Sequence, residues 1–181
     1  MTYVLPAALR DIDGKSVEVE RLAKEKRLVI VTLKATWCSV CVNQLVRLNR
    51  LLPQLKSCGA TFVVLSPGPQ QALAEVRKQA RFPYPFVEDP KLDLAKKLDL
   101  VLGPDQIRPA IFVVNKEREM VWMQYGRSGA HYGDDALMKY LGCGYDLTGL
   151  EGERLSPLTT TPSGRPSRPC RSAGSCRRAS S

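Results

Sequence analysis

Hydrophobic and polar positions alternate along this chain in runs that predict strands and helices in turn. Apolar residues dominate 28–34 and again 61–65, and both runs have the β-branched character of buried strands. From Cys41 to about Lys56, apolar residues recur every three or four positions, which predicts an amphipathic helix that Pro53 would kink or shorten. The chain therefore begins its main body with a strand, a helix and a second strand.

The same alternation continues to about residue 142, and it is preceded by a turn at Asp13–Gly14 that predicts a small opening hairpin. The later predicted elements are a helix over Gln70–Ala80, an extended piece around Phe86–Val87, a helix marked by Leu92, Ala95 and Leu98, a hairpin of Ala110–Val114 and Met120–Tyr125, and a helix over Asp134–Leu141 that ends at Gly142.

This order of elements predicts an α/β fold with one mixed central sheet and helices on both faces. Strands that alternate with helices need crossover connections and therefore pair in parallel, whereas the late hairpin adds antiparallel strands. The 181 residues suit one domain of about residues 1–150 followed by an extension.

The composition changes near residue 150. Residues 151–181 are rich in Ser, Thr, Pro, Gly and Arg, and such a segment buries too little apolar surface to offset the entropy of ordering. We therefore expect a disordered basic tail. From Glu153 onward it holds six arginines against one acid, Glu153, and this part carries +5 of the net charge of +9. The remaining charges are mixed in sign, so the domain shows no nucleic-acid-binding stripe.

The sequence predicts a cytoplasmic protein without a membrane partner. The first residues lack the basic and apolar regions of a signal peptide, and no run approaches the roughly 18 apolar residues of a membrane span. In a reducing compartment a persistent structural disulfide is uncommon, which favours catalysis for closely spaced cysteines.

The strongest chemical signal is Trp37-Cys-Ser-Val-Cys41, which lies between the first predicted strand and its helix. Unpaired N–H groups and the dipole at a helix N-terminus stabilise negative charge, so Cys38 should ionise more easily than a free thiol. The CxxC spacing would let Cys41 resolve a mixed disulfide formed at Cys38.

By itself a CxxC could also be half of a zinc site, a structural disulfide or a pair of inert thiols. Zinc needs two more ligands, and the remaining candidates do not have the spacing of a zinc motif. They are Cys58, Cys143, Cys170, Cys176 and the single histidine, His131. We expect Cys58 and Cys143 to be unpartnered thiols at element ends, His131 to lie in a surface loop, and no cofactor to be bound.

Three segments together resemble the thioredoxin-fold superfamily, in particular its AhpC/TSA (TlpA-like and peroxiredoxin-like) branch, over roughly residues 3–142. The first is Ala35-Thr-Trp-Cys-Ser-Val-Cys41, after a strand and before a helix. The second is Arg108-Pro-Ala-Ile-Phe-Val-Val-Asn115, which is similar to the family's segment with a cis-proline. The third is Phe86-Val-Glu-Asp-Pro90, followed by a helix.

The resemblance implies a thiol–disulfide oxidoreductase in which Cys38 attacks the substrate and Cys41 resolves the intermediate. Trp37 would flank the site. Pro109 would follow a cis peptide bond and expose the backbone of Arg108 to a bound substrate. The implied partners are a protein or small-molecule disulfide or peroxide and a thiol electron donor.

The chain departs from the family pattern at two positions. Thr32 stands where many thioredoxins have a buried aspartate that assists proton transfer, and Lys34 stands where an aromatic residue is common. These departures keep two alternatives open. One is a peroxiredoxin-like thiol peroxidase that uses Cys41, with Arg108 replacing the family's arginine. The other is a redox-inactive interaction module, because fold does not imply activity.

Overall fold

The computed structural model describes residues 3–126 and 133–143. All of them belong to the first of two units into which the chain divides, Met1–Asp146 and Leu147–Ser181. The predicted tail, 151–181, lies outside the described residues, as do His131, Cys170 and Cys176. The predicted domain boundary at residue 150 therefore stays a prediction.

A five-stranded mixed sheet forms the centre of the unit, as the sequence predicts. Its strands follow the order β5-β4-β3-β8-β9, in which β3, β4 and β5 are parallel, β8 is antiparallel to β3, and β9 is antiparallel to β8. Their bounds are Arg27–Thr32 for β3, Ala60–Ser66 for β4, Phe86–Glu88 for β5, Ala110–Val114 for β8 and Met120–Tyr125 for β9.

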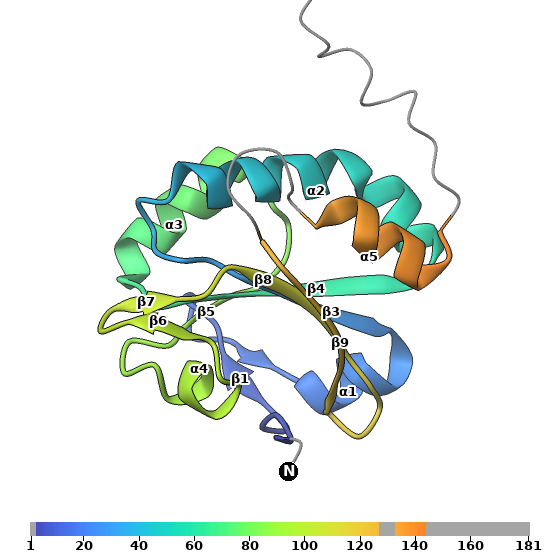
Figure 1. Cartoon of the computed structure of the whole chain (residues 1–181), viewed down its shortest axis with the longest axis horizontal. Coiled ribbons are helices and arrows are strands. Elements are labelled where there is room, and N and C mark those ends of the chain that lie inside the picture. The colour runs from blue at the N-terminus through green and yellow to red at the C-terminus, as the bar shows by residue number, and fades with distance from the viewer. Residues whose placement is uncertain (1–2, 127–132, 144–181) are drawn as a thin grey trace, which may run out of the picture. The chain divides into compact units, whose positions relative to one another are not determined.

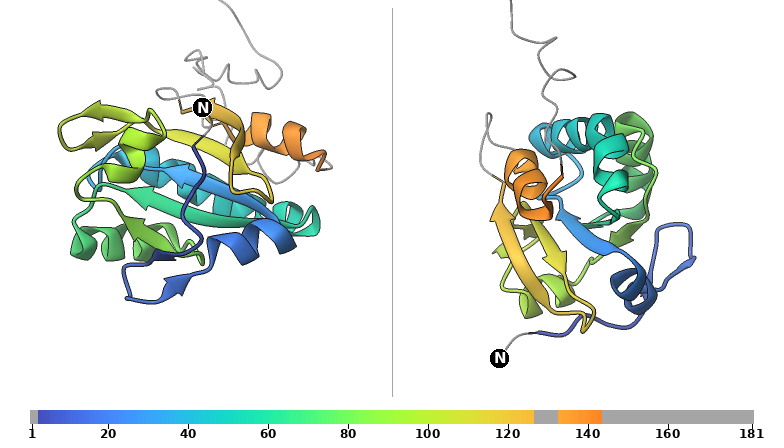
Figure 2. Two further views of the ribbon diagram at one scale, coloured as in Figure 1. Left: turned by 90° about the horizontal axis from the view of Figure 1, so that it is seen from below. Right: turned by 90° about the vertical axis from the view of Figure 1, so that its right-hand side faces the viewer.

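Helices cover both faces of this sheet (Figures 1 and 2). On one face lie α2 (Ser39–Ser57), α3 (Gln70–Ala80) and α5 (Asp134–Leu141), and on the other lie α1 (Val19–Glu25) and α4 (Asp93–Lys97). Successive strand residues point to opposite faces, and all of β3 from Leu28 to Thr32 is buried, so the sheet has a core on each side. None of the described helices has the length and apolar character needed to cross a membrane.

Several elements differ from the prediction or were not predicted. The opening hairpin is confirmed as β1 (Leu9–Arg10) and β2 (Ser16–Val17), but α1 and the small hairpin of β6 (Val101–Gly103) and β7 (Gln106–Ile107) were missed. Pro53 does not shorten α2, which continues to Ser57. The proline is exposed there, so its ring faces solvent on the outer side of the helix.

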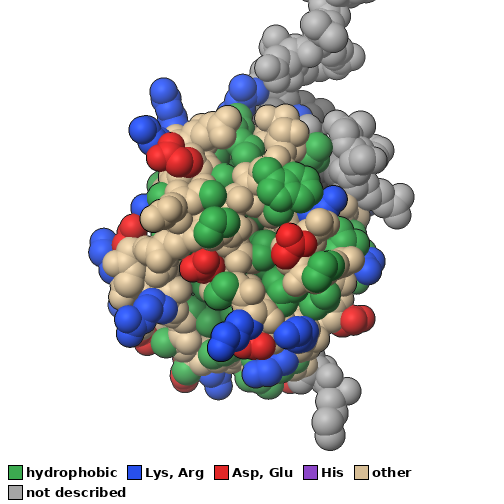
Figure 3. Space-filling model, turned by 90° about the vertical axis from the view of Figure 1, so that its left-hand side faces the viewer, with side chains coloured by type: hydrophobic (Ala, Val, Ile, Leu, Met, Phe, Trp, Pro, Cys, Tyr) green, Lys and Arg blue, Asp and Glu red, His purple; other side chains and the backbone are tan. Residues whose placement is uncertain are grey.

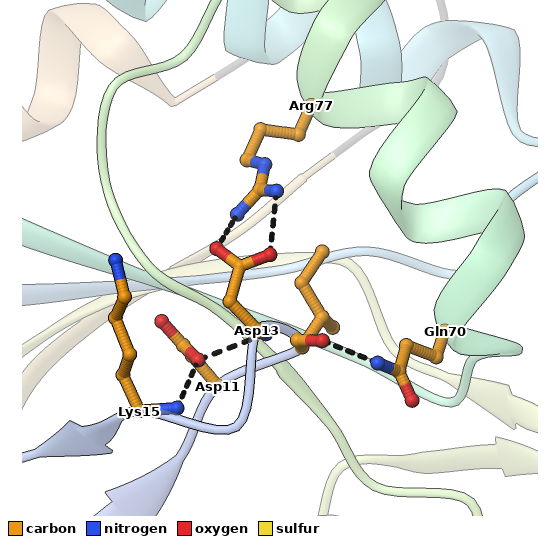
Figure 4. A network of polar contacts seen from close by, with 6 residues as sticks. Asp11, Asp13, Lys15, Gln70 and Arg77 are labelled. Atoms are coloured by element: carbon orange, nitrogen blue, oxygen red, sulfur yellow. Dashed lines mark hydrogen bonds and ion pairs between the residues drawn. The ribbon is translucent and has the colours of Figure 1, made fainter.

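A polar network attaches the loop between β1 and β2 to helix α3 (Figure 4). Asp11 accepts hydrogen bonds from the backbone N–H groups of Asp13 and Lys15, at 2.9 and 2.8 Å. Arg77 donates to both carboxylate oxygens of Asp13, at 2.7 and 2.9 Å, and this hydrogen bonding holds the pKa of Asp13 below its ordinary value. Gln70 donates to the carbonyl of Ile12.

Candidate active site

The candidate site lies at one end of the sheet, where β3 ends and β8 begins. The strand register aligns Thr32 of β3 with Ala110 of β8, and Ala110 with Tyr125 of β9. The chain leaves β3 at this edge and enters α2 after six residues. Figure 3 shows this end of the molecule, where hydrophobic side chains lie among acidic and basic ones and no single charge dominates.

Cys38 and Cys41 lie at the first turn of α2 and are joined by a disulfide, with their Cα atoms 5.3 Å apart. Cys38 is the N-cap residue, and its sulfur accepts a hydrogen bond from the backbone N–H of Cys41 at 3.3 Å. The sulfur of Cys41 accepts from the backbone N–H of Lys34 at 3.4 Å. Each sulfur therefore has a backbone donor that would also stabilise a thiolate.

The two sulfur-bearing residues differ in exposure. Cys41 is 2% exposed, whereas Cys38 is half-buried and is flanked by Trp37, which is 65% exposed. The ammonium of Lys34 lies 5.2 Å from the centroid of the Trp37 ring, a cation–π distance. A substrate can therefore approach Cys38 past the indole ring, while Cys41 is shielded from it.

Arg108 and Pro109 lie next to this loop, but the predicted cis bond is wrong. Among the described residues the only cis peptide bond is Gly68–Pro69, so the bond that precedes Pro109 is trans. The Thr32 hydroxyl explains how the trans segment is held: it donates to the carbonyl of Arg108 and accepts from the N–H of Ala110, both at 2.7 Å. The chain is thereby fixed on both sides of the proline.

The backbone of Arg108 is engaged within the protein. Its N–H donates to the carbonyl of Leu100 at 2.6 Å, and its carbonyl accepts from Thr32. The exposed guanidinium lies 5.3 Å from the ring centroid of Tyr125. Arg108 thus presents its side chain to solvent, and its predicted role in substrate binding remains a prediction.

Lys34 links the disulfide loop to this second segment. Its N–H donates to Cys41, and its carbonyl accepts from the N–H of Ile107 at 3.2 Å. From the sequence, Lys34 was noted only as the replacement of an aromatic residue of the family, and this backbone bridge, the structural role of Thr32 and the pairing of Tyr125 with Arg108 were missed. A backbone contact depends little on side-chain identity, so the sequence contains no signal for it.

A shallow pocket of about 320 Å³ lies beside Cys38 on the side of α3. Its lining is uncharged and mostly polar, and Trp37 forms one wall of it. The lining residues are Thr36, Trp37, Ser39, Val42, Asn43 and Gln79. Arg108 and Pro109 do not line this pocket, so the predicted site residues border the disulfide on different sides.

The remaining described cysteines are not unpartnered, contrary to the prediction. Cys58 and Cys143 are joined by a disulfide, with their Cα atoms 5.7 Å apart. The pairing was missed because 85 residues separate the two positions, and only the packing of α5 against α2 brings them together. Within residues 3–126 and 133–143, no group of three or more His, Cys, Asp or Glu side chains could hold a metal ion.

The arrangement at Cys38 and Cys41 supports reversible two-electron chemistry. An accessible sulfur at a helix N-terminus is a competent nucleophile once it is reduced, and a second sulfur within bonding distance can resolve whatever forms there. The disulfide and dithiol states of this pair therefore define an oxidised and a reduced form of the site.

Comparison with known proteins agrees with this fold. No curated protein matches the sequence. Similar solved structures include peroxidoxin BcpB from Mycobacterium tuberculosis, with 17% identity over 78% of this chain and 95% of that one and a TM-score of 0.68. Peroxiredoxin Q from Xanthomonas campestris has 19% identity over 78% and 96% of the two chains and a TM-score of 0.65.

A PrxQ mutant from Xylella fastidiosa is similar to the same degree, with 16% identity over 78% of this chain and 95% of that one and a TM-score of 0.66. At these identities the structures show a shared thioredoxin-like fold. The AhpC/TSA family model matches residues 4–123, which is most of the described chain and includes both cysteines of the site. The chain therefore belongs to the AhpC/TSA family, and its general class of activity is that of a thiol-dependent oxidoreductase.

Proposed function

We propose that the protein reduces disulfides by thiol–disulfide exchange at Cys38. The observation that carries the proposal is the difference in exposure within the pair: Cys38 is half-buried at the N-cap of α2, and Cys41 is 2% exposed behind it. A substrate sulfur can reach the first and not the second. This asymmetry supports attack by Cys38 and resolution by Cys41.

The reaction has two exchange steps. The Cys38 thiolate attacks one sulfur of the substrate disulfide, that bond breaks, and the other substrate sulfur leaves and takes up a proton. Cys41 then loses a proton and attacks Cys38, the mixed disulfide breaks, and the second substrate thiol leaves. Two electrons pass to the substrate, and a thiol electron donor must reduce the Cys38–Cys41 disulfide again.

The surroundings supply part of what these steps need. The N–H of Cys41 donates to the Cys38 sulfur and stabilises its negative charge. The N–H of Lys34 does the same for Cys41 when it becomes the attacking group. Thr32 cannot accept the proton of Cys41 in place of a carboxylate, so we expect that proton to pass to solvent.

Insulin reduction with a thiol donor tests this proposal. The full chain should reduce insulin, Cys38→Ser should not, and Cys41→Ser should accumulate a mixed disulfide at Cys38. Cys58→Ser is the matched control, because it removes one cysteine at the far end of the same helix. Turnover that survives in Cys38→Ser would rule out the assigned roles.

A second candidate is peroxide reduction at Cys41, which the family match favours. One of the similar structures is described by the alkyl peroxide reduction activity of the Xanthomonas campestris bacterioferritin comigratory protein. Here the Cys41 thiolate would attack the O–O bond, release an alcohol or water and become a sulfenic acid. Cys38 would then attack the sulfenic sulfur, which releases water and forms the disulfide.

The two candidates predict opposite behaviour of single variants. In the peroxidase, Cys38→Ser still reacts once with hydrogen peroxide, and a dimedone adduct forms at Cys41. In the disulfide reductase, Cys38→Ser loses insulin reduction and forms no such adduct at stoichiometric peroxide. Mass spectrometry of the treated variant distinguishes the two.

A further inference from the structure

The second disulfide joins the C-terminal ends of two helices. Cys58 is the C-cap of α2, and Cys143 directly follows the glycine that ends α5. Their Cα separation of 5.7 Å lies within the range of about 4.4–6.8 Å that disulfides require. We propose that Cys58 and Cys143 form a reversible redox-sensitive cross-link, here called the α2–α5 clasp, that exchanges electrons independently of Cys38 and Cys41.

The length of α2 makes the two disulfides independent. The helix has 19 residues, and at about 1.5 Å per residue it separates its ends by roughly 28 Å. Thiol–disulfide exchange requires direct contact between sulfurs, so the pair at one end cannot reduce or oxidise the pair at the other within one molecule. The clasp therefore needs an external partner and goes beyond the function proposed for Cys38.

The exposure of the two residues identifies where that partner reacts. Cys58 is half-buried, whereas Cys143 is 7% exposed. Exchange with a low-molecular-weight disulfide would begin when the Cys58 thiolate attacks it and releases one thiol. Cys143 then loses its proton, attacks Cys58 and releases the second thiol. Two electrons pass to the small disulfide, and the two protons end on the two released thiols.

The electrostatics at this end of α2 makes the clasp slow to exchange. Cys58 lies at the C-terminus, where the helix dipole disfavours a thiolate. Although Lys56 adds a positive charge to this turn, its ammonium lies 6.0 Å from the ring centroid of Tyr84, at a cation–π distance. We therefore expect the clasp to close and open more slowly than the Cys38–Cys41 pair under the same reagent.

Opening the clasp would free only the end of α5. At the start of α5, the carboxylate of Asp134 accepts two hydrogen bonds from Arg47, at 2.8 and 3.0 Å, and Asp134 is 2% exposed. Leu137 and Met138 are fully buried. The last contacts, from Gly142 N–H to Lys139 and from Cys143 N–H to Met138, lie next to the disulfide and depend on it most. The clasp would thus control the ordering of the final turn.

Disulfide mapping of the full-length Cys38→Ser/Cys41→Ser double variant tests the pairing. This variant lacks the site of the proposed function, so its result does not depend on that function. After reduction and then treatment with oxidised glutathione, alkylation and digestion should yield a peptide pair linked through Cys58 and Cys143. Adding Cys143→Ser should abolish that pair. Free Cys58 and Cys143 after oxidation, or a link from either to Cys170 or Cys176, would overturn the proposal.

Hydrogen exchange measures the consequence for α5. Residues 138–143 should exchange at least about tenfold faster in the reduced than in the oxidised double variant, while the first turn at Asp134 stays unchanged. With Cys58→Ser added, the final turn should exchange at the reduced rate under both conditions. Equal exchange in the oxidised and reduced proteins would show that the cross-link controls nothing in the helix.

Discussion

The two ends of helix α2 carry the same residue type in opposite electrical environments. At the N-terminus, Cys38 meets unpaired N–H groups and the positive end of the helix dipole, and at the C-terminus Cys58 meets the negative end. A thiolate is stabilised at the first position and disfavoured at the second. The difference teaches that the position of a cysteine along a helix decides whether its sulfur is a nucleophile.

The two pairs also differ in how they come together. Cys38 and Cys41 are three positions apart, so the first turn of one helix brings them into contact. Cys58 and Cys143 are 85 positions apart and meet only after α5 has packed on α2. Local geometry therefore builds the reactive pair, whereas the cross-link at the other end depends on the finished fold.

The largest expected effect is on turnover and separates the two cysteines directly. Cys38→Ser should lower the rate of insulin reduction by about 10³-fold or more, since the step that forms the mixed disulfide loses its nucleophile. Cys58→Ser should leave the rate within about twofold. Equal losses in the two variants would erase the distinction between the helix ends.

The next effect concerns the contact that holds α5 to α2 away from the cross-link. Asp134→Ala should lower the free energy of unfolding by about 2–4 kcal/mol, because it leaves Arg47 without its buried carboxylate. Urea denaturation under reducing conditions measures this loss. Lys24→Ala is the control, since its pairing with Glu20 is exposed and should contribute little to stability. A change no larger than the control would mean that α5 is held by apolar packing alone.

A smaller effect should appear in the alkylation rates of the reduced protein. A helix dipole contributes roughly 0.3–1 kcal/mol at each end, so the two ends together favour the Cys38 thiolate over the Cys58 thiolate by about tenfold. Iodoacetamide at pH 7, followed by peptide mass spectrometry, should label Cys38 about tenfold faster than Cys58. Faster labelling of Cys58 would contradict the electrostatic argument, and unfolding in urea should remove the difference.

The smallest effect concerns the loop between β1 and β2, which Arg77 and Gln70 attach to α3. The pKa of Asp13 is lowered by hydrogen bonding to Arg77 from an ordinary value of 3.8, so its contribution to stability is present above that pH. It is lost as the pH falls through the lower folded-state value. Carboxyl NMR titration should show this depressed pKa, and Arg77→Gln should return it toward 3.8. Neither disulfide should respond to this change.

The sequence predicted the elements whose pattern is set by periodicity. Helix α3, strands β8 and β9 and helix α5 have the predicted bounds. Helix α1 was missed because it has seven residues, four of them charged, and only the burial of Val19 and Ala23 indicates that it packs as a helix. The β6–β7 hairpin was missed because its strands are two or three residues long and Val101 and Leu102 are exposed.

At the candidate site, the sequence identified the dithiol but not the contacts that position it. The CxxC at a strand-to-helix junction is a local pattern, and the structure places both cysteines there. The bond before Pro109 was predicted to be cis but is trans, and the hydrogen bonds of Thr32 with Arg108 and Ala110 on either side of it cross the sheet, so no local pattern reveals them. The Cys58–Cys143 pair was missed for the same reason, because tertiary packing determines which cysteines meet.

The chain's two tryptophans lie in two different surroundings, and this gives each pair of cysteines an optical reporter. Trp37 is exposed beside Cys38, so its fluorescence should rise when reduction removes the neighbouring disulfide, which quenches an indole. Trp122 stacks on Tyr140 of α5, with ring centroids 5.0 Å apart. Replacing Trp37 with Phe leaves the fluorescence of Trp122, which follows the docking of α5. Replacing Trp122 instead leaves the fluorescence of Trp37, which follows the redox state of Cys38 in real time.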